Sequence, residues 1–112
     1  MEYLNRIELQ GTIGHIRTSP MMGDKKVTNF SLCTECVEPS PLSGMIIKET
    51  TWLNVAAWDG PNIDSRIHSA SKNTPVYVKG RLRMSLYTDN DGMEKKYYEV
   101  LASELKVLDE TE

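Results

Sequence analysis

Residues 75–88 alternate between two kinds of side chain with a period of two. A period of two places successive side chains on opposite faces of a β-strand, so this pattern predicts a strand and argues against a helix. One face is apolar, and we expect it to be buried: Val76, Val78, Gly80, Leu82, Met84 and Leu86. The other face is basic and aromatic, and we expect it to point outward: Tyr77, Lys79, Arg81, Arg83, Ser85 and Tyr87.

Four further segments have the periodicity or composition of strands. They cover residues 4–17, 27–34, 45–59 and 94–108, with turn-rich stretches at 19–24, 39–44 and 89–92. Between the third and fourth strands, Gly60-Pro61 fits a helix start, and Ile63, Ile67 and Ala70 recur at helical spacing, which predicts a short helix ending near Asn73.

Five strands with one short helix between the third and the fourth are the arrangement of an OB-fold. The predicted fold class is therefore all-β with one short helix, as a five-stranded Greek-key barrel. Barrels of this kind bind oligonucleotides or oligosaccharides across one face and its loops.

Length and charge restrict the class of protein further. The chain has 112 residues, enough for one domain, which we assign to residues 1–108, followed by a short acidic end at 109–112. Three of the 16 acidic residues lie in that end, and the other 13 balance the 13 lysines and arginines. A neutral domain argues against holding duplex DNA by bulk charge but permits a local basic stripe.

No apolar run approaches the roughly 20 residues of a transmembrane helix, and two cysteines are too few for a secreted disulfide framework, so we expect a cytoplasmic protein without a membrane partner.

Aromatic residues and cations are the candidate binding residues. The strand over 45–59 places Trp52, Asn54, Ala56 and Trp58 on one face and aliphatic residues on the other. This separation favours exposed stacking surface for Trp52, while stacking and core packing both stay open for Trp58. Aromatic platforms between cations are what single-stranded nucleic acid requires, although an exposed strand face also carries charges simply to be solvated. The candidate contacts are Trp52, Trp58, Tyr77, Lys79, Arg81, Arg83 and Tyr87, with Lys25, Lys26, Lys95 and Lys96 near the hairpin tips.

Reactive side chains do not form a recognisable catalytic or metal motif. Cys33 and Cys36 have the spacing of half a zinc site, but no second cysteine pair exists, and His15 and His68 lack the spacing that would complete one. We interpret Cys33 as a strand residue. Cys36, three positions later, then points to the opposite face of the strand. Common phosphate-cradling and catalytic motifs are absent, so we expect no enzyme activity, no cofactor and no metal.

Several segments follow one another in an order typical of one family. They are Asn5-Arg6-Ile7 with Gly11 and Gly14, residues 27–32, Thr51 to Val55, Val76 to Arg83, Tyr87-Thr88-Asp89 with Gly92, and Leu105 to Leu108. In these segments the chain resembles the bacterial and phage single-stranded DNA-binding proteins (SSB). The resemblance implies an OB-fold that assembles, usually as a homotetramer, and covers single-stranded DNA in replication, recombination and repair without sequence preference. It maps the stacking aromatics of the family onto Trp52, Trp58 and Tyr87.

The chain departs from the family pattern at two places. A further stacking tryptophan of many relatives falls near Val37 or Glu38, which cannot stack, so we expect a weakened path there. Relatives continue into a disordered tail with an acidic Pro-Phe tip, whereas this sequence stops at Glu112. Recruitment of repair proteins by such a tip is therefore not expected, and a minimal mobile-element or accessory form fits.

Two other functions stay open. One is that of the dimeric OB-fold primosomal subunits, adaptors in replication restart that act mainly through protein partners. The other, an oligosaccharide-binding OB-fold or a small enzyme, predicts no affinity for DNA. The expected partners are single-stranded DNA and further copies of the chain, as a tetramer or a dimer.

Overall fold

Five strands form a closed barrel in the computed structural model, which describes residues 1–21 and 23–108. The strands are β1 (Ile7–Pro20), β2 (Lys26–Pro39), β3 (Ile46–Trp58), β4 (Pro75–Thr88) and β5 (Glu94–Val107). Their order around the barrel is β1-β2-β3-β5-β4, and neighbours are antiparallel except for β3 and β5, which are parallel. The predicted all-β, five-stranded barrel is confirmed, although β2 continues well beyond its predicted end at residue 34.

Alternate side chains of the strands fill the barrel, as the period of two predicts. The buried core cluster consists of Ile13, Phe30, Leu32, Val55, Ala57, Ile67, Val76, Val78, Val100 and Leu105. Burial was also expected for Leu82, Met84 and Leu86, but 37%, 46% and 52% of their surfaces are exposed. That expectation is wrong because β4 and β5 leave the barrel together after Gly80, which carries the second half of the apolar face out of the core.

One irregularity of register lies in β1. Gly14 and His15 together oppose a single residue of β2. The extra residue allows Ile13 and Ile16 both to pack on the core although they are an odd number of positions apart. Beyond this point His15 and Arg17 are exposed.

A second irregularity lies in β5. Ser103 is the extra residue at the register shift between Lys79 and Gly80 of β4. It allows Val100 and Leu105 both to be buried, and it reverses which positions of β5 point outward.

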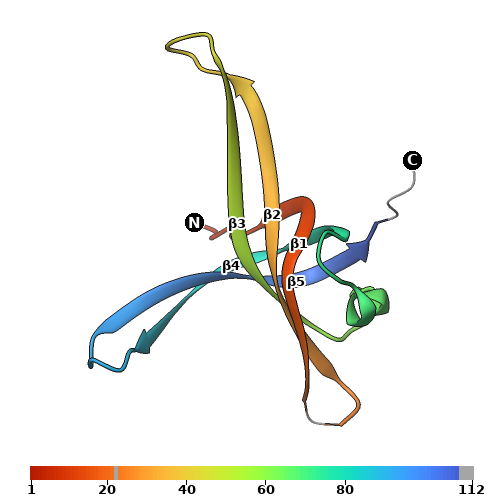
Figure 1. Ribbon diagram of the computed structural model, residues 1–112. Coiled ribbons are helices and arrows are strands. Elements are labelled where there is room, and N and C mark those ends of the chain that lie inside the picture. Colours follow the sequence, from red (N-terminus) through yellow and green to blue (C-terminus); the bar gives the residue numbers. More distant parts are fainter. Residues whose placement is uncertain (22, 109–112) are drawn as a thin grey trace.

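Three hairpins extend from the barrel (Figure 1). The β2–β3 hairpin rises at the top of the view, the β4–β5 hairpin projects to the lower left, and the β1–β2 hairpin points downward. Their turns follow the register pairs Pro39–Ile46, Thr88–Glu94 and Pro20–Lys26. The first and last of the turn-rich stretches therefore lie at hairpin tips, as predicted, and the stretch at 39–44, which was expected only to separate two strands, forms a third tip.

The predicted helix is much shorter than its spacing implied. A 3-10 helix, η1 (Ser65–Ser69), replaces the expected helix over residues 60–73. Backbone hydrogen bonds in this segment join residues three apart, including Ile67 N–H to the Asp64 carbonyl at 3.1 Å. Spacings of three and four place side chains on one side of such turns as well, so Ile67 is fully buried without an α-helix. No helix in residues 1–21 and 23–108 is long and apolar enough to cross a membrane.

Candidate nucleic-acid interface

Strand register builds a continuous surface across β2, β3, β5 and β4. Residues paired on neighbouring strands point to the same side of a sheet, so successive pairs define rows of side chains. One row consists of Ser31, Asn54, Glu99 and Arg83. The next row, two residues away on each strand, consists of Asn29, Ala56, Leu101 and Arg81. We call these two rows, together with Trp52 and Trp58 on β3, the outer face.

The two tryptophans lie on either side of these rows. Trp52 has 57% of its surface exposed and Trp58 has 54%, which excludes core packing for both. Trp52 lies against Gly14 of β1, because a Cβ built on that glycine would fall 2.6 Å from the indole carbon Cζ3. The backbone of β1 thus supports the Trp52 ring while more than half of its surface stays open.

A hollow of about 340 Å³ opens beside Asn54 on the outer face. Its wall is largely apolar, with the ring of Tyr97 as an aromatic side, but it also carries side chains that can form hydrogen bonds: His15, Arg17, Asn29, Ser31, Asn54 and Glu99. The Ser31 hydroxyl accepts a hydrogen bond from the backbone N–H of His15 at 2.9 Å, which joins β1 to the edge of the outer face. We call this space the polar hollow.

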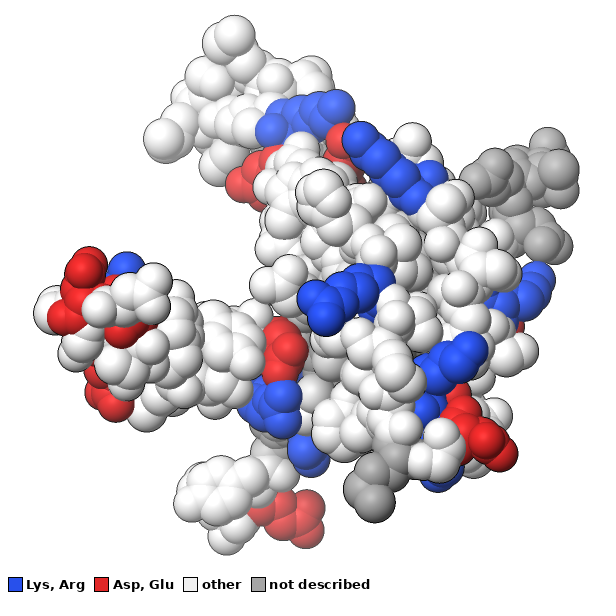
Figure 2. Space-filling model, turned by 60° about the horizontal axis from the view of Figure 1, so that its bottom comes forward, with Lys and Arg blue, Asp and Glu red and all other residues white. Residues whose placement is uncertain are grey.

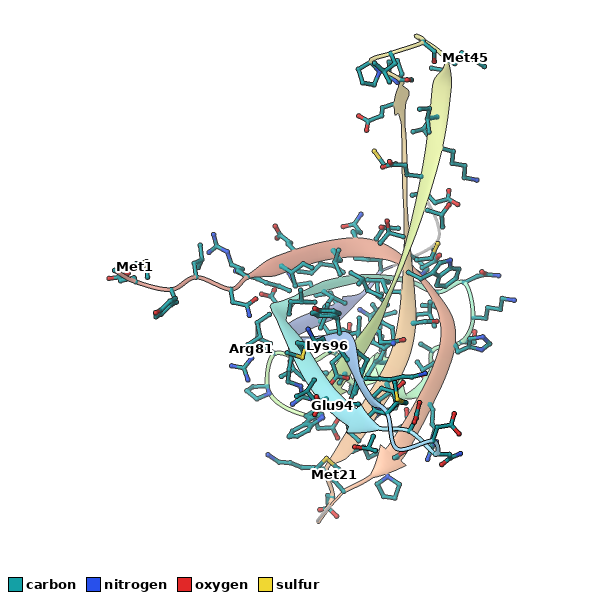
Figure 3. The ribbon with its side chains drawn as sticks, turned by 90° about the vertical axis from the view of Figure 1, so that its left-hand side faces the viewer. Met1, Met21, Met45, Arg81, Glu94 and Lys96 are labelled. Atoms are coloured by element: carbon teal, nitrogen blue, oxygen red, sulfur yellow. The ribbon has the colours of Figure 1, made fainter. Side chains whose placement is uncertain are left out.

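A second hollow, of about 240 Å³, brings Trp58 together with Arg81 and Arg83. Its floor is apolar and consists of Ala56, Leu101 and Ala102. Arg81 is exposed and projects from β4 (Figure 3). Arg83 forms an ion pair with Glu99, in which its Nε donates to Oε1 at 3.1 Å and its Nη2 contacts the same oxygen. Since Glu99 lines the polar hollow and Arg83 lines this one, the ion pair connects the two.

Trp58 also lines a third hollow, of about 290 Å³, at the base of the β1–β2 hairpin. Its other walls are Met21, Lys25, Lys26 and Asp59. Met21 marks this hairpin at the bottom of Figure 3. The structure therefore places cations on two sides of Trp58, two arginines from β4 and two lysines from the hairpin.

Asp59 holds this corner together. The Nε2–H of His68 donates to Asp59 Oδ1 at 2.7 Å, and the backbone N–H of Lys26 donates to Oδ2 at 3.0 Å. The Asp59 N–H in turn donates to the Lys26 carbonyl at 3.0 Å. The hydrogen bond from His68, followed by that from Lys26, keeps the pKa of Asp59 below its usual value. An ionised Asp59 thus fixes Lys26 next to Trp58.

The β4–β5 arm carries a pair of tyrosines. Tyr87 and Tyr97 meet edge to face, with their ring centroids 5.7 Å apart and their planes at 63°. Lys95 is in register with Tyr87, and its Nζ lies 3.2 Å from Asp89 Oδ2. Lys96, the next residue, lies on the opposite face of the arm. Of the two lysines predicted as contacts here, only Lys95 therefore shares a face with Tyr87.

Tyr77 and Lys79 lie on the part of β4 that pairs with β1, away from the three hollows. The Tyr77 hydroxyl donates to the Glu8 carboxylate, and this hydrogen bond is the main reason that the pKa of Tyr77 is raised to about 12. Lys106 Nζ lies 5.9 Å from the Tyr77 ring centroid. Lys79 is in register with both Glu8 and Glu104. The structure thus separates these two predicted contacts from Trp52 and Trp58.

Charge is unevenly distributed over the hairpins. Figure 2 shows acidic side chains crowded at the end of the arm that projects to the left. This is the β4–β5 tip, which carries Asp89, Asp91 and Glu94. On the β2–β3 arm, Lys48 forms an ion pair with Glu35 at 3.3 Å, and Val37, one of the two positions at which the resemblance led us to expect a weakened path, is exposed. The cations that face open hollows therefore lie near the barrel and not at these two tips.

Sequence reasoning missed most of the polar hollow. Asn54 was placed on the tryptophan face of β3, but no ligand contact was predicted for it. His15 and Arg17 were missed because the extra residue in β1 changes the alternation. Tyr97 and Glu99 follow a plain alternation in β5, which could have placed them opposite the outward residues of β4.

The two cysteines behave as expected for strand residues. Both are free, and register places Cys33 beside Trp52 and Cys36 beside Glu49, on opposite faces of the β2–β3 pair. Among the residues that the structure describes, no three His, Cys, Asp or Glu side chains gather as a metal site.

Comparisons with known proteins agree on one family. The family model described as single-strand binding protein family matches residues 4–108. Single-stranded DNA-binding proteins from two strains of Neisseria meningitidis, of serogroups A and B, are each 28% identical over 108 residues. These alignments cover 94% of this chain and 60% of each relative, so the chain spans a little under two thirds of their length.

Solved structures give the same result. A Plasmodium falciparum SSB in complex with single-stranded DNA superposes with a TM-score of 0.83 at 28% identity, over 97% of this chain and 98% of that one. A deletion variant of the single-stranded DNA binding protein from Thermus aquaticus gives 0.73 at 19% identity, over 96% of this chain and 51% of that one, which supports the fold alone. The barrel described above is thus the OB-fold of these proteins.

Proposed function

Because the chain belongs to the single-strand binding protein family, we propose that it binds single-stranded DNA across the outer face. The observation that carries the proposal is the convergence of Trp58 with Arg81 and Arg83 around one open hollow. An exposed indole offers a stacking surface to any base, and the exposed guanidinium group of Arg81 beside it pairs with a phosphate that flanks that base. This combination binds DNA through features common to all sequences.

A path for the strand follows from the arrangement of the aromatics. Trp52 and Trp58 are six residues apart on one strand, about 20 Å at roughly 3.3 Å per residue, so each accommodates a different base. Tyr87 extends the series onto the β4–β5 arm. Each stacked base contributes about 1–3 kcal/mol.

Cations along the path supply the electrostatic part of binding. Arg81, Lys25 and Lys26 are exposed beside the hollows that Trp58 lines, whereas Arg83 and Lys95 already hold carboxylates. If about four phosphates are neutralised, the logarithm of the binding constant falls with the logarithm of salt concentration at a slope near −3 for a single strand. Tyr77 and Lys79 would extend the path only if the strand continued around β4 toward β1.

Family membership also supports the wider role. We infer that the chain covers and protects single strands in replication, recombination or repair, as a binding protein and not as an enzyme. Cytoplasmic location and assembly as a tetramer or dimer belong to the same proposal.

The test is a titration of the intrinsic tryptophan fluorescence with oligo-dT at low and high salt. Both tryptophans of the chain lie on the outer face, so stacked bases should quench their emission. Saturable quenching that weakens with salt supports the proposal. Absence of both quenching and binding at low salt would overturn it and favour the dimeric adaptor, which a dimer mass and capture of a protein partner would then identify.

A further inference from the structure

Glu99 is the residue of the outer face that a phosphate-binding surface does not explain. It is only 9% exposed, and it lies in the middle of the row that runs from Ser31 through Asn54 to Arg83. A carboxylate at this position repels phosphates and offsets the positive charge of Arg83 beside it. Binding by stacking and phosphate contacts alone would be stronger without it.

The geometry leaves half of the Glu99 carboxylate available. Both hydrogen bonds from Arg83 end on Oε1, and Oε2 accepts none from any residue in the described part of the chain. No buried side-chain oxygen among the described residues lacks a partner, so Oε2 is not completely buried. Glu99 lines the polar hollow, and a carboxylate oxygen without a partner can accept a hydrogen bond from a group that enters it.

The polar hollow has the size and the lining of a site for one flat polar group. Its volume of about 340 Å³ falls at the lower end of the roughly 300–1,000 Å³ of small-molecule sites. Asn29 and Asn54 each provide a donor and an acceptor, and Tyr97 provides an aromatic ring. Arg83 holds the Glu99 carboxylate in place, so this acceptor does not have to be ordered when the ligand arrives.

On the proposed function, the flat polar groups that pass over this face are the bases of the strand. We propose that the polar hollow takes one base and that Glu99 makes it favour a base with an exocyclic amino group over thymine. Carboxylates accept hydrogen bonds from the amino group of cytosine, whereas thymine presents a carbonyl oxygen at the same ring position. The site adds a preference at one position to binding that otherwise tolerates any sequence.

The experiment compares two homopolymers of equal length, oligo-dC and oligo-dT, by fluorescence anisotropy of an end label at one salt concentration and slightly alkaline pH. Cytosine and thymine have similar rings, so the ratio of their dissociation constants isolates the hydrogen-bonding edge. For the unmodified chain we expect oligo-dC to bind about fivefold more tightly or better. In Glu99→Gln the side-chain amide can turn to donate or to accept, and the ratio should fall close to one.

Two variants accompany this measurement. Glu104→Gln makes the same change of charge on the same strand, outside the polar hollow, and should keep the ratio of the unmodified chain. Asn54→Ala alters an exposed wall of the hollow without touching the ion pair, and should also lower the preference for oligo-dC over oligo-dT. This variant keeps the inference testable if Glu99→Gln fails to fold.

Each outcome decides a different point. Equal affinity of the unmodified chain for the two oligomers overturns the inference and leaves single-strand binding intact. A preference for oligo-dC that survives both Glu99→Gln and Asn54→Ala overturns it as well, because the preference then arises elsewhere. Failure to bind either oligomer overturns the proposed function itself, and the inference with it.

Discussion

Tyr87 and Tyr97 pack edge to face on the β4–β5 arm, with ring centroids 5.7 Å apart. The contact fixes the Tyr87 ring, which the family resemblance aligns with a stacking aromatic. We expect Tyr87→Ala to weaken binding of oligo-dT by about 1–3 kcal/mol, the contribution of one stacked base. Anisotropy titrations measure this loss. Tyr3→Ala, which removes an exposed tyrosine that precedes β1, should bind as the unmodified chain does, and equal losses in both variants would contradict a specific role for Tyr87.

Trp52 depends on the small residue beneath it. Gly14→Ala introduces a methyl group 2.6 Å from both the indole and the Ser31 hydroxyl, so the ring has to move. We expect a shift in tryptophan emission and a loss of oligo-dT affinity approaching that of Trp52→Ala, about 1–3 kcal/mol. A Gly14→Ala chain with shifted emission but unchanged affinity would show that the position of this ring does not matter for binding.

Gly80 lies where β4 begins to leave the barrel. A Cβ at this position would overlap the carbonyl oxygen of Leu101 on β5, and backbone cannot give way as a flexible side chain does. Gly80→Ala should therefore lower the free energy of unfolding by about 1–3 kcal/mol or more, as measured by urea denaturation. Gly60→Ala is the matched control, because its Cβ would meet only ordinary contact at 3.8 Å.

Asp64 ties η1 to the end of β5. It accepts hydrogen bonds from the Arg66 side chain, from the backbone N–H of Val107 and from that of Arg66, which together hold its pKa far below the usual value. The folded pKa is thus below the unfolded pKa of about 3.9, so this stabilisation is complete above that pH and is lost as the pH falls toward the folded pKa.

Asp64→Asn tests this dependence. At neutral pH we expect the variant to be less stable by about 1–3 kcal/mol, because charge-assisted hydrogen bonds are lost. Thermal unfolding measured over a series of pH values should show the two chains converging as the solution is acidified below about pH 4. A constant difference at every pH would mean that the charge of Asp64 does not contribute.

Arg81 is the exposed arginine of the Trp58 hollow. Removing one phosphate contact should change the slope of log affinity against log salt by about 0.7 for a single strand. We therefore expect Arg81→Ala to weaken oligo-dT binding and to flatten the salt dependence by this amount. Lys72→Ala removes one positive charge outside the three hollows and should leave the slope unchanged.

The barrel was predictable because the alternation of apolar with charged or aromatic side chains directly indicates its strands. Val76 and Val78 alternate with charged or aromatic residues, and the turns are rich in Gly, Pro, Asp and Asn, so strand positions and hairpins could be read from the sequence. The exposure of Trp52 followed from the same rule. Alternation reports the face of a strand but not how far that strand stays in the barrel, which is why the burial expected for Leu82 was wrong.

The remaining site depended on contacts between distant strands. Asn54 and Glu99 become neighbours only through the parallel pairing of β3 with β5, which no local pattern reveals. Arg83 was predicted as a free cation because its partner lies 16 residues away on another strand. The separation of Tyr77 from the tryptophans likewise follows from the closure of β4 against β1.

The extra residue at Ser103 acts as a phase change within β5. Before it, odd-numbered positions such as Glu99 belong to the outer face, and after it, even-numbered positions such as Glu104 point outward. Without the extra residue, only one half of β5 could point its apolar side chains inward, and either Val100 or Leu105 would be turned out of the core. Insertion or deletion of one residue between 101 and 104 would therefore exchange inside for outside along half a strand, whereas the hairpin tips can change length without that consequence.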